Sequence, residues 1–309
     1  MRIKRLSMCL GLLLLVLATL TPSHATAAIQ ITDGRGPLSF PTAPKRVVVL
    51  NWDLLEQVLE LDVIPVGAPN LTGYSQWVLN PVPPSTIEDI GTRAEPNLDK
   101  ITQLKPDVIL AASPQKDLLE ALGRIAPVVY LPNFRAQEQA GLAAIEHFKT
   151  LGTLFAREET ARQKLNAMEQ RFHAMKEDLV HSFGKAEKVV AMRFSNTTSV
   201  FIYSENSTAN FVLQQLGLTP AMPLPAKPWG IVQKRLKDLR NMTDAYVLYV
   251  LPFPDEKKLH RSILWKAMPF VRHGRVRSVQ PVWNYGGAMS LLYMAEEFSR
   301  SLLEMVPEK

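Results

Sequence analysis

The 309-residue sequence has few of the features that mark an enzyme, a disulfide-stabilised domain or a membrane-spanning protein. Its single cysteine, Cys9, leaves no disulfide within the chain and no thiolate metal site. The uncharged apolar run over residues 8–20 is shorter than the roughly 20 residues that a bilayer-spanning helix needs. No Gly-x-Ser-x-Gly elbow or glycine-rich phosphate loop occurs, and the histidine spacings match no zinc site. These absences disfavour catalysis.

The N-terminus has the three parts of a cleaved secretory signal. Basic residues within the first five positions precede the apolar run, and the small-residue triplet Ala25-Thr26-Ala27 follows it. We therefore expect export to the periplasm with cleavage after Ala27; a retained membrane anchor is the alternative. Cleavage removes Cys9 and half of the net charge of +6. The remaining net charge of about +3 is too small to indicate a nucleic acid-binding surface.

Beyond residue 28, apolar runs alternate with helical patterns twice, which indicates two α/β lobes. Apolar runs without internal alternation predict strands buried on both faces, as in parallel sheets. In the first half these runs lie at 46–50, 63–67, 107–111 and 128–131. In the second half they lie at 188–194, 199–203, 246–251 and 275–279.

The longest helical pattern lies between the two halves. Residues 157–183 include no Gly or Pro, and their apolar side chains are spaced by three and four. About 27 residues form a rod on the order of 40 Å long, which is enough to run along both lobes. We predict two α/β lobes with mainly parallel sheets, joined by this rigid helix around a ligand cleft. The predicted units are a signal peptide (1–27), an N-terminal lobe (28–154), the linking helix (155–184) and a C-terminal lobe (185–309).

Aromatic side chains in turns mark the predicted cleft. Four of the five tryptophans fall at strand ends or in loops, whereas Trp265 falls inside a helical pattern and is expected to pack in a core. Trp and Tyr offer large, rigid contact surfaces with one polar group, which suits a bulky and partly apolar ligand. Covering the edge of a core is the alternative for any one of them. The four are Trp52, Trp77, Trp229 and Trp283.

A cationic side chain accompanies these aromatic residues. Arg93 opens the turn before a predicted helix, where its guanidinium can donate a fork of hydrogen bonds to anionic oxygens. An ion pair with Asp89 or Glu95 is the alternative interpretation.

At these residues the sequence resembles the periplasmic iron(III)-siderophore binding proteins of ABC importers, and among them the ferric hydroxamate (ferrichrome) branch. The resemblance implies that a ferric siderophore is captured in the periplasm and delivered to an inner-membrane permease and its ATPase. It implies a monomer that is not an enzyme and has no cofactor or metal of its own, because the siderophore holds the iron. The matching segments are RVVVLNWDLLEQVLELDVIPVG, IGTRAEPNLDKITQLKPD, RIAP, LWKAMPFVRHGRV and PVWNYGGAMS.

The resemblance also implies roles for particular residues. Arg93 stands where an arginine donates to iron-bound hydroxamate oxygens, and the loop 112–116 lacks the tyrosine that assists it in the family. Gln115 is expected to supply a hydrogen bond there instead, or Lys116 a charge, and Asn284 makes an aromatic position polar. These departures leave open another hydroxamate, a citrate-type chelate or a catecholate. The aromatic cleft positions are Trp52, Trp77, Trp229, Trp283 and Tyr285.

The resemblance also implies that acidic residues dock the protein to its permease, and the residues leave other functions open. Asp99 and Asp238 are expected to pair with permease arginines, although either can be an ordinary solvated aspartate. A cobalamin or haem binder of the same fold is the first alternative, with Tyr285 or His273 as an axial haem ligand. Arg93 favours an anionic chelate over haem. The second alternative is a periplasmic enzyme, and a sensor with a membrane partner cannot be separated from a transport protein at this stage.

Overall fold

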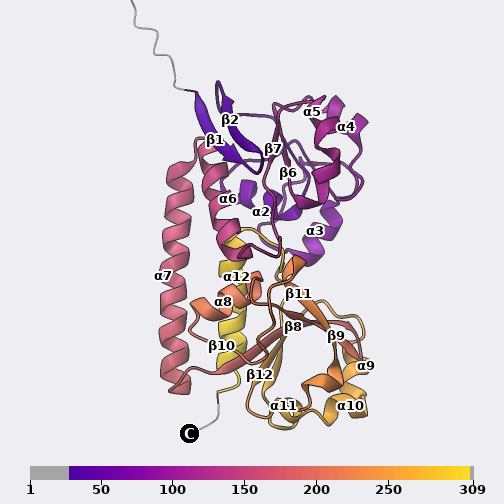
Figure 1. Ribbon diagram of the computed structural model, residues 1–309, viewed down its shortest axis with the longest axis vertical. Coiled ribbons are helices and arrows are strands. Elements are labelled where there is room, and N and C mark those ends of the chain that lie inside the picture. Colours follow the sequence, from indigo (N-terminus) through magenta and orange to yellow (C-terminus); the bar gives the residue numbers. More distant parts are fainter. Residues whose placement is uncertain (1–27, 307–309) are drawn as a thin grey trace, which may run out of the picture.

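The computed structural model describes residues 28–306, so the predicted signal peptide and the last three residues lie outside the described part. Two α/β lobes are arranged along the long axis of the molecule, and helix α7 (Glu158–Phe183) runs beside both of them (Figure 1). This confirms the predicted architecture of two lobes and one linking helix. Among the described residues, no helix combines the length and the apolar character needed to cross a membrane.

The N-terminal sheet has the order β5-β4-β3-β6-β7, and every pair in it is parallel. Val47 and Val49 pack into the core on one face of the sheet, while Val48 packs into the core on the other, so that the strand is buried on both sides. The strand predicted over 63–67 is confined to Gly67–Ala68, since Pro65 has no N–H to give to a sheet. The strands are β3 (Val47–Val49), β4 (Gly67–Ala68), β5 (Glu88–Asp89), β6 (Val108–Ala111) and β7 (Val128–Tyr130).

Short helices follow each of these strands and cover both faces of the sheet. An antiparallel hairpin of β1 (Ile29–Asp33) and β2 (Gly36–Phe40) precedes the sheet, and neither it nor helix α6 was expected from the sequence. The helices are α2 (Trp52–Glu60), α3 (Leu71–Trp77), α4 (Leu98–Gln103), η1 (Ser113–Leu118), α5 (Leu119–Gly123) and α6 (Ala140–Leu154).

The C-terminal sheet has the order β11-β9-β8-β12-β13 and is less uniformly parallel than predicted. Strands β8, β12 and β13 are parallel, β9 lies antiparallel between β8 and β11, and β10 adds a short parallel pairing to β8. The strands are β8 (Lys188–Asn196), β9 (Ser199–Tyr203), β10 (Thr219–Pro220), β11 (Ile231–Arg235), β12 (Tyr246–Val250) and β13 (Val276–Val279).

Seven short or medium helices surround the C-terminal sheet within residues 28–306. Trp265 lies on one of them with 4% of its surface exposed, which confirms its predicted role in the core. The helices are α8 (Thr208–Gln215), η2 (Pro228–Gly230), η3 (Leu236–Leu239), α9 (Glu256–Arg261), α10 (Ile263–Lys266), α11 (Pro269–Arg272) and α12 (Ala288–Leu303).

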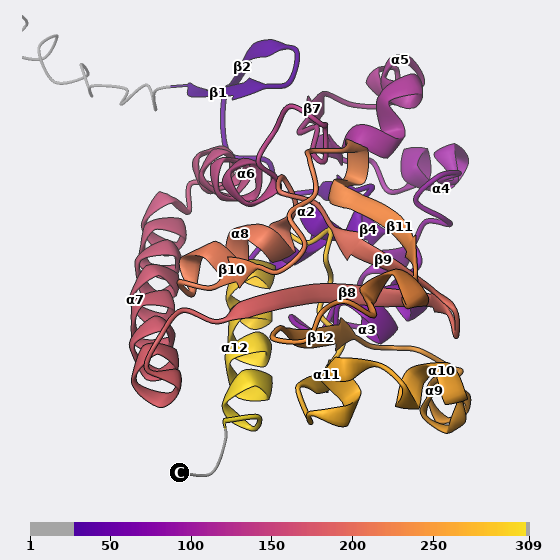
Figure 2. The ribbon, with the colours of Figure 1, turned by 60° about the horizontal axis from the view of Figure 1, so that its bottom comes forward.

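Helix α7 matches the predicted pattern closely. Its 26 residues extend about 39 Å, and it ends at Gly184, whose left-handed backbone (φ 72°) suits glycine. Figure 2 shows α12 lying beside α7, and the two helices pack against each other. Helix α6 packs against α7 as well, so α7 is supported from the side by two helices. Its buried residues are Ala161, Met168, Phe172, Met175 and Leu179.

A buried carboxyl group ties the end of the chain to the N-terminal lobe. Glu56 on α2 accepts hydrogen bonds from the backbone N–H groups of Gly287 (3.0 Å) and Ser290 (2.6 Å) and from the Ser290 hydroxyl. These donors lie at the N-terminus of α12, where a carboxyl group is favourable. The loop that precedes α12 is thereby held against the N-terminal lobe.

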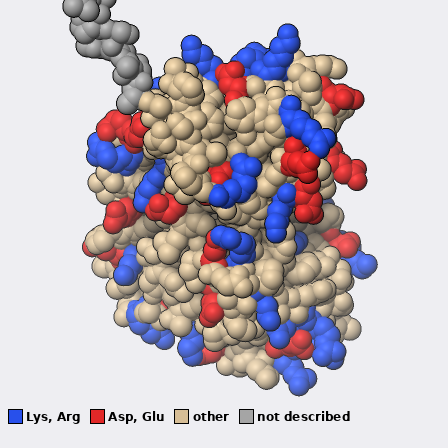
Figure 3. All heavy atoms as spheres, turned by 45° about the horizontal axis from the view of Figure 1, so that its top comes forward, with Lys and Arg blue, Asp and Glu red and all other residues tan. Residues whose placement is uncertain are grey.

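Surface charge is mixed on the face drawn in Figure 3. Lys and Arg side chains are interspersed with Asp and Glu side chains there and do not gather into one basic stripe. A basic stripe is the usual footprint of a nucleic acid-binding protein.

Candidate functional site

A cavity of about 570 Å³ lies between the two lobes, within the usual size range of small-molecule sites. The N-terminal lobe contributes residues that follow the carboxyl ends of its parallel strands, the edge at which ligands of α/β sheets bind. The C-terminal lobe contributes β8, η2 and the loop before α12. The lining residues are Asn51, Asn70, Thr92, Arg93, Ala94, Pro114, Phe134, Arg193, Trp229, Trp283 and Tyr285.

Arg93 lies in the loop between β5 and α4 and presents its guanidinium to this cavity. The guanidinium lies 4.0 Å from the centre of the Trp52 ring and 5.3 Å from that of Trp283. Such contacts contribute about 1 kcal/mol each at partly exposed sites. Among the described residues Arg93 forms no ion pair, so the alternative pairing with Asp89 or Glu95 is wrong.

The ring beneath Arg93 is fixed in place. Trp52 is 3% exposed, and its indole N–H donates to the carbonyl oxygen of Pro69 at 2.9 Å. Trp52 therefore serves as a platform under the arginine and is not itself part of the open wall of the cavity. Its contact with a ligand is indirect, through Arg93 and Trp283.

Asp53 lies next to Trp52 and influences the arginine electrostatically. Burial raises the pKa of Asp53 to about 7, while backbone hydrogen bonds and the positive charge of Arg93 act in the opposite direction. The Asn133 amide donates to one oxygen of this carboxyl group, and the other oxygen has no partner. Burial also lowers the pKa of Arg93, and Asp53 opposes that shift. Near neutral pH Asp53 is only partly ionised, so it does not cancel the charge of Arg93.

Aromatic rings join the two lobes around Trp283. The ring centres of Trp52 and Trp283 are 5.0 Å apart, those of Trp77 and Trp283 are 6.1 Å apart, and those of Trp283 and Tyr285 are 5.4 Å apart. All three pairs meet edge to face, which is the preferred geometry of aromatic pairs. Residues from α2 and α3 thus contact the loop before α12.

Trp229 forms the opposite part of the wall and is 44% exposed. Its ring stacks on Phe134 at 6.0 Å and meets Tyr285 edge to face at 6.0 Å. Trp229 and Phe134 both have positive φ angles (64° and 59°), which are costly for aromatic residues. The hydrogen bond from the Trp229 N–H to the Phe134 carbonyl (3.0 Å) couples these two backbone segments.

The structure brings most of the predicted site residues together, although their roles differ. Arg93, Trp229, Trp283 and Tyr285 line the cavity, whereas Trp52 lies beneath it. Trp77 is the last residue of α3 and not part of a loop, and it reaches the site only through its contact with Trp283.

Gln115 corrects the sequence-based expectation. It is fully buried, its Nε2 donates to the carbonyl oxygen of Arg93 at 2.6 Å, and its Oε1 accepts from the Ala112 N–H at 3.0 Å. Gln115 does not line the cavity, and its two hydrogen bonds join the Arg93 loop to the turn after β6, so it positions the Arg93 loop. Asn284 likewise lies outside the main cavity, where it is 7% exposed beside Trp77 and Arg193.

Seven of the lining residues were not predicted from the sequence, and the two with the largest side chains among them are Arg193 and Phe134. Arg193 stands in the middle of β8, and the signal for it was an arginine inside the otherwise apolar run VVAMRF. Phe134 follows β7, the strand next to β6 at the edge of the sheet. Phe134 therefore fits the rule that residues after strand ends supply the site, whereas Arg193 enters the cavity from within a strand.

The remaining predicted residues lie away from the cavity. Asp99 is exposed in the first turn of α4. Asp238 is exposed on η3 and accepts a hydrogen bond from the Arg235 N–H at 3.1 Å. His273 follows α11 and does not line the cavity, so it does not converge with Tyr285 on a common haem position.

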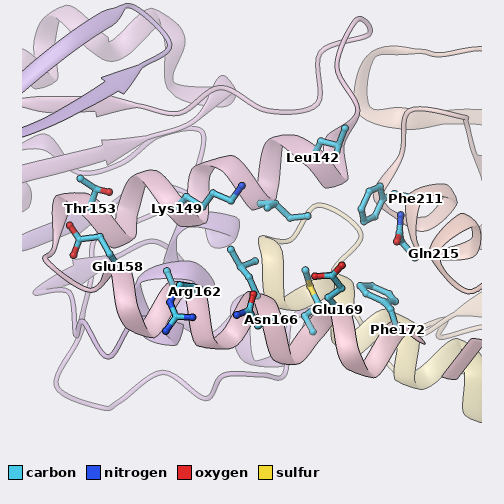
Figure 4. Close-up of a pocket in the computed structure, with 14 residues that line it drawn as sticks. Leu142, Lys149, Thr153, Glu158, Arg162, Asn166, Glu169, Phe172, Phe211 and Gln215 are labelled. Atoms are coloured by element: carbon cyan, nitrogen blue, oxygen red, sulfur yellow. The ribbon is translucent and has the colours of Figure 1, made fainter. Parts of the chain in front are cut away.

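A second hollow of about 650 Å³ lies between α6, α7 and α8 (Figure 4). Phe172 and Phe211 belong to its apolar lining, and Figure 4 shows their rings at the same end of the hollow. Lys149, Glu158, Arg162 and Glu169 surround it with charges of both signs. This hollow is larger than the cavity between the lobes, but it is lined by helices and not by residues at the carboxyl ends of the strands. We therefore do not assign the ligand to it.

The chain has recognisable relatives. Residues 47–240 match the periplasmic binding protein family. The siderophore binding protein FhuD of Vibrio cholerae, whose crystal structure has Fe3+-Desferal bound, is 63% identical, with a TM-score of 0.84 over 85% of this chain and 99% of that one. The iron(3+)-hydroxamate-binding protein FhuD of Escherichia coli K12 is 28% identical over 84% of this chain and 87% of its own length. The Fe(3+) dicitrate-binding periplasmic protein FecB of the same bacterium is 25% identical over 96% and 93%.

Proposed function

The chain belongs to the periplasmic binding protein family, and from that premise we propose that it captures a ferric siderophore of the hydroxamate type in the cleft between its lobes and delivers it to an ABC importer. One observation supports the ligand class above the others. The Arg93 guanidinium faces the cavity over Trp52 and has no carboxylate partner among the described residues. A cation held in this way is ready to donate charge-assisted hydrogen bonds to the iron-bound oxygens of a chelate.

The siderophore supplies the iron ligands in this proposal. Among residues 28–306 no group of three or more His, Cys, Asp or Glu side chains is placed to hold a metal ion. The protein instead surrounds the chelate with Trp229, Trp283 and Tyr285, whose rigid rings contact its organic shell at low entropic cost. No chemical step is needed, and the protein acts as a binding protein without a cofactor.

Delivery and location complete the proposal. The chain acts in the periplasm after cleavage of residues 1–27, as a monomer divided at 28–154, 155–184 and 185–309. Asp99 and Asp238 are exposed, one on each lobe, and are the residues we propose to pair with arginines of an inner-membrane permease whose ATPase drives transport. Loss of transport in an Asp99→Asn, Asp238→Asn double variant that retains ligand binding tests this part.

Tryptophan fluorescence of the mature chain, titrated with ferric and iron-free chelates, tests the ligand class. The panel includes a ferric hydroxamate, ferric citrate, a ferric catecholate, haem and cobalamin. We expect saturable quenching by the ferric hydroxamate and about 10- to 100-fold weaker binding in Arg93→Gln, because charge-assisted hydrogen bonds are lost. Arg124→Gln is the matched control, since Arg124 is exposed and paired with Glu120 on α5. Its affinity is expected to stay within about twofold of the wild type.

Two results would contradict the proposal. Saturation by haem or cobalamin in place of the ferric hydroxamate would keep the fold and overturn the ligand. Equal affinities of Arg93→Gln and Arg124→Gln would remove Arg93 from the site.

A further inference from the structure

We infer that Arg193 makes the cleft selective for hydroxamate chelates that have a carboxylate outside the iron-binding core. The inference rests on the proposed function and deepens it, because it concerns the part of the ligand that does not touch iron. Arg193 comes from the C-terminal lobe, and Arg93 comes from the N-terminal lobe. The two arginines therefore present positive charge to one cavity from different walls.

The strand geometry directs Arg193 toward the ligand. Val190, Met192 and Phe194 of β8 pack in the core of the C-terminal lobe, so the intervening Arg193 points to the other face of the sheet. Arg193 pairs in register with Phe201 of β9, and its guanidinium lies 4.4 Å from the centre of that ring. The ring fixes the side chain at the cavity wall without neutralising it.

Arg193 lacks the partners that other arginines of this chain have. Arg35, Arg162 and Arg300, for example, each pair with a carboxylate within 3.0 Å. Among the described residues no carboxylate oxygen lies within 4.0 Å of Arg193, and its Nε is buried without a hydrogen-bond partner. A partly buried cation with an unpaired donor favours an anionic ligand group, since that group restores the hydrogen bonds that water would make.

The cavity has no fixed negative charge of its own to balance the two arginines. None of the described lining residues is Asp or Glu. Asp53 is not a lining residue, and burial raises its pKa to about 7, so it offsets at most part of the charge of Arg93. The positive charge on the C-terminal side is therefore available to the ligand.

The chelate core has too little negative charge to pair with both arginines. Three hydroxamate groups balance the charge of iron(III), so the core is neutral and its bound oxygens have only partial negative charge. Arg93 suffices for these oxygens. A carboxylate on the siderophore backbone provides the matching group for Arg193, with the two parallel hydrogen bonds that guanidinium and carboxylate form well.

Three ferric complexes with one common core test the inference. Ferric desferrioxamine B has a pendant ammonium group, its N-acetyl derivative has no pendant charge, and its N-succinyl derivative has a pendant carboxylate. Affinities are measured by tryptophan quenching on the mature chain, at about 20 and 150 mM salt to separate contact from screened long-range attraction. We expect the affinity to rise from ammonium to acetyl to succinyl, with about a tenfold gain in the last step.

Two variants assign the effect to Arg193. Arg193→Met retains the length and apolar contact of the side chain and is expected to abolish the gain from the succinyl group, so that the succinyl complex loses about tenfold more affinity than the acetyl complex. Arg277→Met is the matched control, because Arg277 lies on β13 of the same lobe, outside the cavity, near Glu304. It removes the same net charge and is expected to preserve the whole order.

Each other outcome overturns the inference in a recognisable way. Equal wild-type affinities for the three complexes refute charge selectivity and leave the proposed function intact. An equal loss for all three complexes in Arg193→Met makes Arg193 a general contact. A charge order that survives in Arg193→Met assigns it to another residue. Failure of all three complexes to bind the wild type refutes the proposed function itself, and the inference with it.

Discussion

Replacing Glu56 with glutamine is the most informative single perturbation of the connection between α2 and α12. Glu56 is fully buried, and burial raises the pKa of its carboxyl group to about 8, although Ser290 and the Gly287 N–H act in the opposite direction. Below that pH the group is neutral in the folded protein, while in the unfolded chain it ionises above about 4.5. The folded state therefore holds the proton more tightly than the unfolded state.

The direction of the pH dependence follows from this difference. The contribution of Glu56 to stability is greatest below about pH 4.5, where the carboxyl group is protonated in both states. This contribution decreases as the pH rises and is smallest above pH 8, where both states have lost the proton. One group with such a shift changes the free energy of unfolding by up to about 1.4 kcal/mol per pH unit. Between pH 5 and pH 8 the wild type is expected to lose a few kcal/mol from this group, which is a large part of a typical stability of about 5–15 kcal/mol.

Urea denaturation at pH 5 and pH 8 measures this loss. In Glu56→Gln the side chain is neutral in both states, so the difference between the two pH values is expected to shrink by a few kcal/mol relative to the wild type. Asp53 and His147 also have shifted pKa values, but they contribute equally to both proteins and cancel in the comparison. Glu146→Gln, on the exposed side of α6, is the control. An unchanged pH dependence in Glu56→Gln would refute the reasoning.

Two further predictions follow from the same contacts. Gln115→Leu removes the 2.6 Å hydrogen bond to the Arg93 carbonyl and leaves Arg93 itself intact. Fluorescence titration is expected to show about tenfold weaker binding of a ferric hydroxamate. An unchanged affinity would show that the Arg93 loop keeps its position without this hydrogen bond. Small-angle scattering of the mature chain is expected to show little compaction on ligand binding, because α7 is a continuous helix and α12 packs along it; a large decrease in the radius of gyration would contradict this.

The main architecture was predictable because it depends on strong local patterns. The run Val47–Val49 has no polar residue, and its side chains fill cores on both faces of the sheet, as a parallel strand requires. Helix α7 has the spacing of an amphipathic helix over its whole length, and its buried positions match that spacing. Trp52 and Trp283 were found because they follow predicted strands, where an α/β site forms, and Arg93 was found at the turn before a predicted helix.

The misses have physical reasons as well. Helix α3 contains Thr, Gly and Ser and depends on Asn70 as its N-cap, so the propensity of its own residues gives little sign of a helix. Helix α6 includes two glycines, Gly141 and Gly152, and each faces a neighbouring side chain at close range, which only the assembled fold explains. The buried amide of Gln115 was assigned to the ligand because the backbone carbonyl that it serves is 22 residues away in the sequence.

A crystal structure of the mature chain with a ferric hydroxamate, with the iron located by its anomalous scattering, tests the central claim most directly. The account predicts one iron in the cavity between the lobes, bound only by siderophore oxygens, with the Arg93 guanidinium donating to those oxygens and Trp229, Trp283 and Tyr285 around the chelate. Iron bound by protein carboxylates, or a chelate in the hollow between α6 and α7, would contradict it.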